Sequence, residues 1–255
     1  MFKNYFNLKN LNKIFHHGFF TSIGGISKGN YSSLNCNLSS EDNLNNIKGN
    51  IKLALKNLGI PNKKLKIINQ VHSNKIFFIN QKNFNNKFYG DGLITKEKDI
   101  ALGVLTADCA PIFIKDTHNN YICCLHSGWK GALNNIAGKS IRILKNKNTK
   151  KKKIIAIIGP CLGFKNFEVD KEFKFQFIKK NNSYLRFFKY KNKHKDLFNL
   201  RGLIAFQLKN EGIKNIYNVN RDTYKNSHIF FSHRRLTHQN KINTARMINI
   251  ISLKD

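Results

Sequence analysis

The sequence lacks any run of apolar residues long enough to cross a membrane and any segment typical of a secretory signal. A helix needs about 20 apolar residues to span a bilayer, and no apolar run in these 255 residues reaches that length. Residues 1–20 mix lysine, asparagine and histidine with their apolar residues, without the continuous apolar core of a signal peptide. These absences predict a cytoplasmic protein with no membrane partner.

Cysteine is also scarce, and its number is odd. The five cysteines, which have no regular spacing, are Cys36, Cys109, Cys123, Cys124 and Cys161. A disulfide framework needs an even number at regular positions, so the count argues against one. Free thiols in a reducing compartment fit better.

Acidic residues are few: 14 Asp and Glu stand against 45 Lys and Arg, which gives a formal net charge of +31. A strongly basic balance is typical of proteins that bind nucleic acid. The lysines are spread along almost the whole chain, however, beside abundant Asn, Ile and Phe, and these residue types share AT-rich codons. We therefore expect no specific nucleic-acid partner, only attraction of polyanions at low salt.

What the chain does contain is a globular composition, 41% hydrophobic, with many short apolar runs. Apolar spacing predicts helices at 43–58, 131–144, 170–179 and 196–209, the first capped by Ser40 or Asp42. The short runs predict strands at 65–71, 76–79, 92–95, 100–106, 111–115, 121–126, 154–158, 213–219, 229–232 and 246–253. Because strands and helices do not strictly alternate, we expect an α+β fold, a single domain (1–255) of mixed β-sheets flanked by helices.

Three of the apolar runs end at a side chain that can bind a metal, followed by small or polar residues. These side chains are His72, Cys109 and His126. Two imidazoles and a thiolate suit Zn²⁺, and three protein ligands leave a fourth position open for water or substrate, as in catalytic zinc sites. Their spacing is unlike a compact motif such as CxxC, so two ordinary histidines and one buried cysteine remain the competing interpretation.

The segments around these residues resemble the laccase-domain family, named for multicopper polyphenol oxidases and also described as purine nucleoside phosphorylases. The resemblance covers about residues 21–251 and rests on many motifs in the same order. The motifs are Gly24-Gly25-Ile26-Ser27, Tyr31-Ser32-Ser33-Leu34-Asn35, Gln70-Val71-His72, Asp91-Gly92-Leu93-Ile94-Thr95, Thr106-Ala107-Asp108-Cys109-Ala110-Pro111, His126-Ser127-Gly128-Trp129-Lys130-Gly131, Ile158-Gly159-Pro160-Cys161-Leu162-Gly163, Phe167-Glu168-Val169 and Phe231-Ser232-His233-Arg234-Arg235.

The resemblance implies a laccase-domain fold with His72, Cys109 and His126 as Zn²⁺ ligands. It also implies phosphorolysis of adenosine, inosine, guanosine and methylthioadenosine, with adenosine deamination in the same site. The substrates would then be purine nucleosides and phosphate, and the protein a monomer or a small homo-oligomer. The usual nucleobase-deaminase signature, H-x-E with P-C-x-x-C, is absent here, so deamination would need a different arrangement.

Phosphorolysis requires cationic groups that hold phosphate, and the candidates are Lys130, Arg234 and Arg235. Asp91 and Asp108 are candidates for acid–base catalysis or for orienting the ligands, with capping of turns as the competing interpretation.

Further polar residues of the motifs are candidates for contacts with the nucleoside. Ser27, Asn35 and Gln70 are these candidates, and each could equally satisfy only loop backbone groups.

Four positions depart from the family pattern. Lys130 and His233 stand where Arg and Tyr are frequent, Ile51 replaces an Arg, and Ala245 replaces a Gly before the late Arg. Lysine keeps the charge of arginine but not its bidentate geometry. These departures could weaken activity, while the three metal ligands are intact.

Three other functions compete with this one. A cytoplasmic hydrolase that edits mis-made peptidoglycan precursors would use Cys109 or a metal-bound water on an amide. A copper polyphenol oxidase, which the family's older name suggests, is less favoured because one His₂Cys site matches a multicopper cluster poorly. A basic nucleic-acid-binding protein is the non-catalytic alternative.

Overall fold

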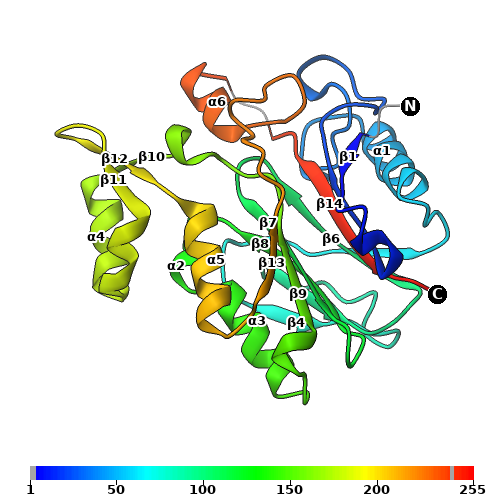
Figure 1. Cartoon of the computed structure of the whole chain (residues 1–255). Coiled ribbons are helices and arrows are strands. Elements are labelled where there is room, and N and C mark those ends of the chain that lie inside the picture. The colour runs from blue at the N-terminus through cyan, green and yellow to red at the C-terminus, as the bar shows by residue number, and fades with distance from the viewer. Residues whose placement is uncertain (1–3, 242–243) are drawn as a thin grey trace.

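The strands of the core are apolar on both faces, and the computed structural model, which describes residues 4–241 and 244–255, shows why (Figure 1). Two β-sheets pack against each other, and each has helices on its outer face. Successive side chains of a strand point to opposite faces. In β7 (Ala110–Asp116), Phe113 therefore enters the layer between the sheets, while Ile112 and Ile114 face the helices. Most side chains of a strand that is covered on both sides are buried, and most of them are therefore apolar.

The first sheet has five strands in the order β1-β2-β14-β6-β3. They are β1 (Tyr5–Phe6), β2 (Phe15–Phe20), β14 (Met247–Leu253), β6 (Ile100–Thr106) and β3 (Lys64–Ile67). Helix α1 (Leu44–Asn57) covers its outer face, where Ala54 and Leu55 pack against Ile248 and Ile250 of β14. The C-terminal strand thus lies in the centre of this sheet, between strands from the first half of the chain.

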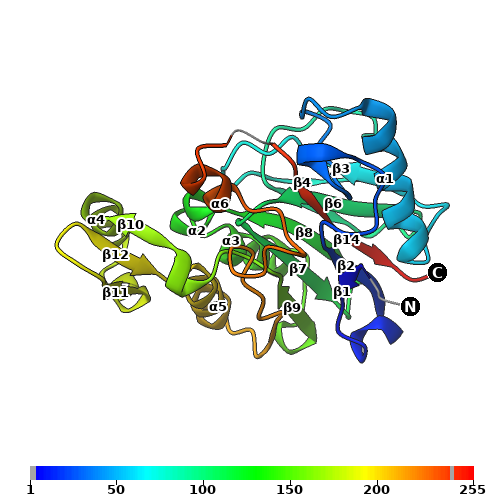
Figure 2. The ribbon, with the colours of Figure 1, turned by 90° about the horizontal axis from the view of Figure 1, so that it is seen from above.

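The second sheet has six strands in the order β13-β9-β7-β8-β5-β4. Besides β7, they are β13 (Asn215–Asn218), β9 (Ile154–Ile158), β8 (Ile122–Ser127), β5 (Gly92–Thr95) and β4 (Ile76–Phe78). Helices α2 (Trp129–Leu133), α3 (Ile136–Lys145) and α5 (Leu200–Asn210) contribute to the core on its outer face. Figure 2 shows the resulting order of layers from α1, through the two sheets, to α3 and α5.

A smaller sheet extends from the side of the second sheet. It consists of β10 (Glu168–Asp170), β12 (Lys195–Phe198) and β11 (Phe188–Tyr190), and α4 (Lys171–Lys180) packs on it through Phe173 and Phe177. Helix α6 (His233–His238) lies above the layers, between this extension and α1 (Figure 1). The prediction of mixed sheets flanked by helices is confirmed.

Several predicted elements agree closely with the structure, including the strands at 92–95, 100–106 and 154–158, but others were wrong. The helix predicted at 131–144 is two helices, because Asn135 has a left-handed backbone (φ 53°) and caps α3. The first part of the helix predicted at 196–209 is β12, and α5 begins only after its cap, Asn199. Residues 229–232 form no strand, since Ser232 caps α6 instead.

Local polar signals caused two further errors. The N-terminal cap of α1 is Asn43, whose side chain accepts hydrogen bonds from the amides of Asn45 and Asn46, rather than Ser40 or Asp42. Strand β2 was not predicted because two histidines interrupt its apolar run. His17 is in fact fully buried in this strand and accepts a hydrogen bond from the amide of Leu8.

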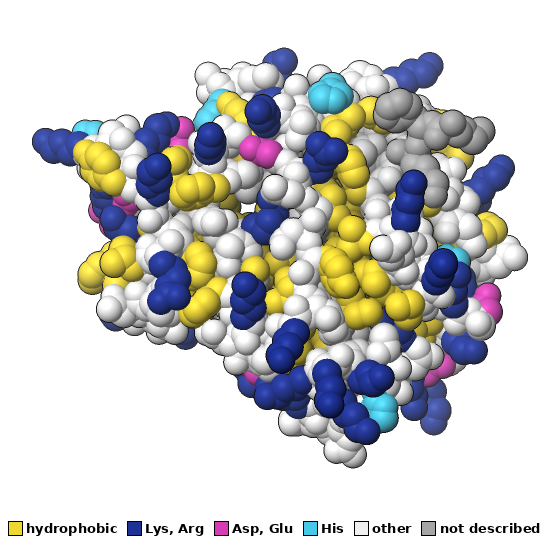
Figure 3. Space-filling view, in the orientation of Figure 1, with side chains coloured by type: hydrophobic (Ala, Val, Ile, Leu, Met, Phe, Trp, Pro, Cys, Tyr) yellow, Lys and Arg dark blue, Asp and Glu magenta, His cyan; other side chains and the backbone are white. Residues whose placement is uncertain are grey.

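Within the described part of the chain, no helix combines the length and the apolar character needed to cross a membrane. The basic side chains do not gather in one place on the face that Figure 3 shows; Lys and Arg are distributed over all of it.

Candidate metal centre

The three predicted metal ligands meet at one edge of the sheets. Cys109 lies in the turn between β6 and β7, His126 lies near the end of β8, and His72 lies in the loop between β3 and β4. Antiparallel pairing of β7 with β8 places Pro111 opposite His126, so Cys109 lies beside the end of β8. The ligand atoms of all three residues lie within 4.8 Å of one another, close enough for one metal ion.

The backbone around this cluster adopts conformations that most residues avoid. His72 has φ 55° and Asp108, which precedes Cys109, has φ 89°. Such left-handed conformations cost about 1–3 kcal/mol each and persist where the surrounding structure holds them. Gly128 is required for a different reason: a Cβ at this position would lie 2.9 Å from Cys109 Sγ and 3.0 Å from His72 Cδ2.

Asp91 orients two of the ligands from a fully buried position at the start of β5. Its carboxylate accepts a hydrogen bond from His126 Nδ1 at 2.8 Å and one from the backbone amide of His72 at 3.1 Å. It also accepts from the amide and the hydroxyl of Ser73. Because Nδ1 of His126 is used in this way, Nε2 is left to bind a metal, an arrangement that is common in zinc sites.

Cys109 and His126 form a charged pair in the absence of metal. Burial raises the pKa of Cys109, but the nearby imidazolium of His126 and hydrogen bonds from His126 and His72 together outweigh burial and lower that pKa to about 6. Burial lowers the pKa of His126, but the Cys109 thiolate and Asp91 raise it to about 9. A thiolate at neutral pH is the form of cysteine that binds metals. The donor set therefore fits a divalent cation such as Zn²⁺.

Two cavities flank the cluster. One, of about 300 Å³, is lined by His72, Cys109, Trp129 and Arg234 among others. The other, of about 520 Å³, is lined by the three ligands together with Gln70 and Arg246. His233, at a position where the family often has Tyr, lines both cavities. His72 and Cys109 thus line both cavities, and His126 lines the larger one.

The three cationic candidates for phosphate binding lie in different surroundings. Arg234 lines the smaller cavity, stacks over Phe167 at 5.6 Å and donates to the carbonyl of Glu168. Arg235 donates instead to three backbone carbonyls, those of Thr223, Tyr224 and Phe230. Lys130 is exposed, and its ammonium group lies over the Trp129 ring at 5.5 Å. Only Arg234 of the three lines either of the two cavities.

Asp108 lies next to the cluster, and its carboxylate is surrounded by donors. It accepts hydrogen bonds from the hydroxyls of Thr223 at 2.6 Å and Ser232 at 3.0 Å, and from the amide of Arg234 at 2.7 Å. These bonds connect the start of α6 to the turn that carries Cys109. This geometry favours a structural role for Asp108, which holds the start of α6 against the turn of Cys109.

The three residues predicted to contact the nucleoside also lie in different surroundings. Gln70 lines the larger cavity, but its amide is held by both backbone groups of Leu105. Ser27 and Asn35 are buried, line neither cavity and interact with Asn50 of α1, which donates to the hydroxyl of Ser27 and the carbonyl of Asn35. Ile51, the neighbour of Asn50, packs against the core beneath α1.

Replacing Asn50 with alanine is expected to lower the free energy of unfolding by about 2 kcal/mol, because several buried polar groups would lose their partner at once. The side chain of Asn50 is fully buried and also accepts from the amide of Ile26. Asn57→Ala, an exposed position on the same helix, is the control and should change stability by less than about 0.5 kcal/mol. Equal effects of the two substitutions in urea unfolding would contradict this role of Asn50.

Arg246 was not among the residues predicted from the sequence. It precedes β14, is partly buried and lines the larger cavity with Cys109 and His126. Burial lowers its pKa, and the negative charges of Cys109 and Asp108 offset this effect only in part. The sequence offered one signal for Arg246, its position directly after Ala245. The prediction considered only the alanine, which departs from the family pattern.

Known proteins resemble this chain over most of its length. A purine nucleoside phosphorylase of Rickettsia conorii is 32% identical over 74% of this chain and 78% of its own length. One of Haemophilus influenzae is 28% identical over 95% of this chain and 96% of its own length.

Solved structures agree in fold. YlmD from Geobacillus stearothermophilus is 26% identical, with a TM-score of 0.84 over 94% of this chain and 92% of that one. A hypothetical protein, YfiH of Bacillus licheniformis, is 24% identical, with a TM-score of 0.89 over 99% and 97% of the two chains. The family model described as multi-copper polyphenol oxidoreductase laccase matches residues 16–254. The chain therefore belongs to the multi-copper polyphenol oxidoreductase laccase family, as its sequence motifs predicted.

Proposed function

We propose that this protein is a zinc-dependent purine nucleoside phosphorylase that acts on adenosine, inosine, guanosine and methylthioadenosine and also deaminates adenosine. The observation that carries the proposal is the His72–Cys109–His126 cluster, which opens onto two cavities lined by arginine. Relatives named purine nucleoside phosphorylase support the same activity. We further propose a single domain over 1–255, a cytoplasmic location, and a monomer or small homo-oligomer.

In phosphorolysis, a phosphate oxygen forms a bond to C1′ of the ribose while the bond from C1′ to the purine nitrogen breaks, and the purine leaves with the electron pair. We assign the phosphate to Arg246 and Arg234, which line the two cavities beside Cys109. Guanidinium groups suit phosphate because they donate two parallel hydrogen bonds. A zinc ion, when bound, would supply a Lewis acid that polarises a substrate oxygen or activates a water for deamination.

In this proposal, Asp91 and Asp108 position other residues of the site. Asp91 holds His126 and the backbone of His72, and Asp108 holds the turn before Cys109 and the amide of Arg234. Burial raises the pKa of Asp91, but its hydrogen bonds from His126 and Ser73 outweigh burial and lower that pKa, which favours the ionised form.

The test is to incubate the purified protein with adenosine and phosphate and to measure ribose 1-phosphate, adenine and inosine. We expect the first two products from phosphorolysis and the third from deamination, all above the level of a Cys109→Ala control. If none of them forms, the proposal fails.

The lowered pKa of Cys109 also favours a second function, amide hydrolysis. The thiolate would attack the carbonyl carbon, the C–N bond would break as the amine leaves with a proton, and water would then hydrolyse the thioester. Peptidoglycan precursors that carry a wrong amino acid are the proposed substrates. Release of that amino acid in the absence of any nucleoside turnover would favour this function over phosphorolysis. Copper oxidation of phenols has weaker support, because within the described residues one such His/Cys cluster is found.

Zinc affinity is expected to rise with pH as Cys109 and His126 lose their protons. Below pH 9 the pair retains one proton, on His126, and below about pH 6 it gains a second, on Cys109. Zinc must displace these protons. Affinity should therefore increase about tenfold per pH unit between pH 6 and 9, and about a hundredfold per unit below 6. Chelator competition across this range measures the slope, and an affinity that does not vary with pH would contradict the assignment.

A further inference from the structure

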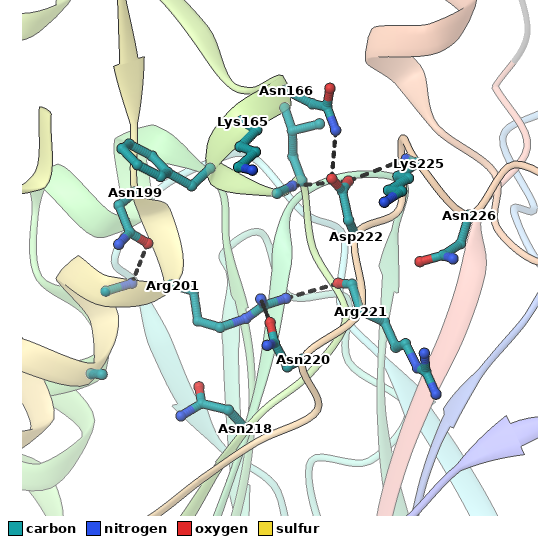
Figure 4. A pocket seen from close by; sticks show the side chains of 15 residues that line it. Lys165, Asn166, Asn199, Arg201, Asn218, Asn220, Arg221, Asp222, Lys225 and Asn226 are labelled. Atoms are coloured by element: carbon teal, nitrogen blue, oxygen red, sulfur yellow. Dashed lines mark hydrogen bonds between the residues drawn. The ribbon is translucent and has the colours of Figure 1, made fainter. Parts of the chain in front are cut away.

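A cavity of about 770 Å³, separate from the two at the metal centre, lies on the other side of the segment that follows β9. Its walls come from three parts of the chain: residues 162–166, the first turns of α5, and residues 218–226 (Figure 4). Leu162 lines both this cavity and the smaller cavity at the metal centre, so the two share a wall. A volume of this size is sufficient for a small metabolite.

The lining of this cavity carries more positive than negative charge. Its cationic lining residues are Lys165, Arg201, Arg221 and Lys225, and none of them forms an ion pair with another described residue. The one acidic lining residue, Asp222, accepts instead from neutral donors, namely the amides of Gly163 and Tyr224 and the side chain of Asn166. Cations that remain unpaired in a concave site favour an anionic ligand.

Arg201, in the first turn of α5, lines the cavity and is held by two hydrogen bonds. It donates through one terminal nitrogen to Asn220 Oδ1 at 2.6 Å and through the other to the carbonyl of Arg221 at 2.8 Å. Figure 4 shows its side chain reaching from α5 to these two groups. Its Nε is buried and has no partner among the described residues. Because Nε is closed to solvent, a ligand in the cavity would contact Arg201 through its terminal nitrogens, each of which carries a second N–H.

The remaining lining suits a planar, partly polar group. The ring of Phe164 is partly exposed and contacts no other ring of the described residues. The side-chain amides of Asn218 and Asn226 also line the cavity and form no hydrogen bond with a described residue. Aromatic rings stack on nucleobases, and asparagine amides match the donor and acceptor edges of a base.

We propose that this cavity is a second binding site, which takes a nucleotide: a phosphate monoester that carries a purine base. Lys165, Arg201 and Lys225 hold the phosphate, Phe164 stacks on the base, and Asn218 and Asn226 contact its edge. Binding here requires neither the metal nor the residues that hold it.

The test is calorimetric titration with adenosine 5′-monophosphate (AMP) at physiological salt. We expect saturable binding to the wild type, and binding at least about tenfold weaker after the double substitution Lys165→Gln/Lys225→Gln, because two charge-assisted contacts with the phosphate are lost. Both side chains are exposed and form no hydrogen bond with another described side chain, so this variant should fold normally. Phe164→Leu should weaken AMP binding, while inorganic phosphate should bind the wild type about tenfold less tightly than AMP.

Two controls separate binding in this cavity from non-specific attraction of anions and from binding at the metal centre. Lys152→Gln/Lys179→Gln removes the same charge from exposed positions outside the cavity and should leave AMP affinity unchanged within about twofold. His72→Ala removes a metal ligand and should also leave it unchanged. The proposal is overturned if AMP does not bind saturably, if the control pair weakens binding as much as the cavity pair, if His72→Ala abolishes binding, or if phosphate binds as tightly as AMP.

Discussion

Replacing Cys109 with alanine should remove the bound metal and reduce phosphorolysis of adenosine by at least about a thousandfold, since a metal ion contributes several kcal/mol of transition-state stabilisation. The substitution leaves two imidazoles, His72 and His126, as ligands and removes the thiolate that neutralises the metal. It also removes one of the two groups that raise the pKa of His126. Metal content by elemental analysis and kcat/KM for adenosine measure the two effects.

Cys161→Ala is the matched control for this variant. Cys161 is a buried thiol close enough to interact electrostatically with Cys109, but burial raises its pKa and it is not part of the metal-binding cluster. Its variant should retain the metal and most of the activity. A loss of activity of similar size in both variants would mean that the substitutions act through packing, and a Cys109→Ala protein that keeps its metal and its activity would exclude the proposed centre.

Replacing Asp91 with alanine is expected to weaken zinc binding by about a hundredfold, at the upper end of the range for groups that orient metal ligands. Three effects act together. His126 loses the acceptor that fixes its ring orientation, the amides of His72 and Ser73 lose theirs, and the left-handed backbone of His72 loses its support. The ligands would all be present, but no longer held in one arrangement.

Chelator competition on Asp91→Ala measures this effect, with Asp99→Ala as the control. Asp99 is an exposed carboxylate that accepts a hydrogen bond from Gln81, and it should not affect zinc affinity. An Asp91→Ala protein that folds and binds zinc as tightly as the wild type would show that Asp91 only caps the turn, the alternative that the sequence left open.

The sequence predicted the central strands well because their signal is local. Residues 92–95, 100–106 and 154–158 are short apolar runs bounded by polar or turn residues, and the same bounds appear in β5, β6 and β9. Prediction failed where contacts between residues far apart in the chain determine the secondary structure. Strand β2 contains two histidines, and it is a strand because β14, from the other end of the chain, pairs with it.

The candidate site, too, could be predicted from the sequence only in part. The motifs identified the family and the three candidate metal ligands, but the phosphate candidates could not be ranked from sequence. Arg234 and Arg235 are adjacent in the chain, yet one lines a cavity and the other is held by three backbone carbonyls. Arg246 has no distinctive sequence motif and lies at the site only because β14 pairs with β6, whose end leads into the turn of Cys109.

The sequence alone therefore determined the family, the central strands and the identity of the metal-ligand candidates, since each depends on residue types at short range or on motifs in order. The structure decided which of these residues act together. A metal site needs ligand atoms within a few ångströms, and His72, Cys109 and His126 are brought that close only by the pairing of strands that are far apart in the chain. The same packing lowers the pKa of Cys109 and raises that of His126, because a pKa depends on all the charges and the solvent around a group, including those of residues far away in sequence.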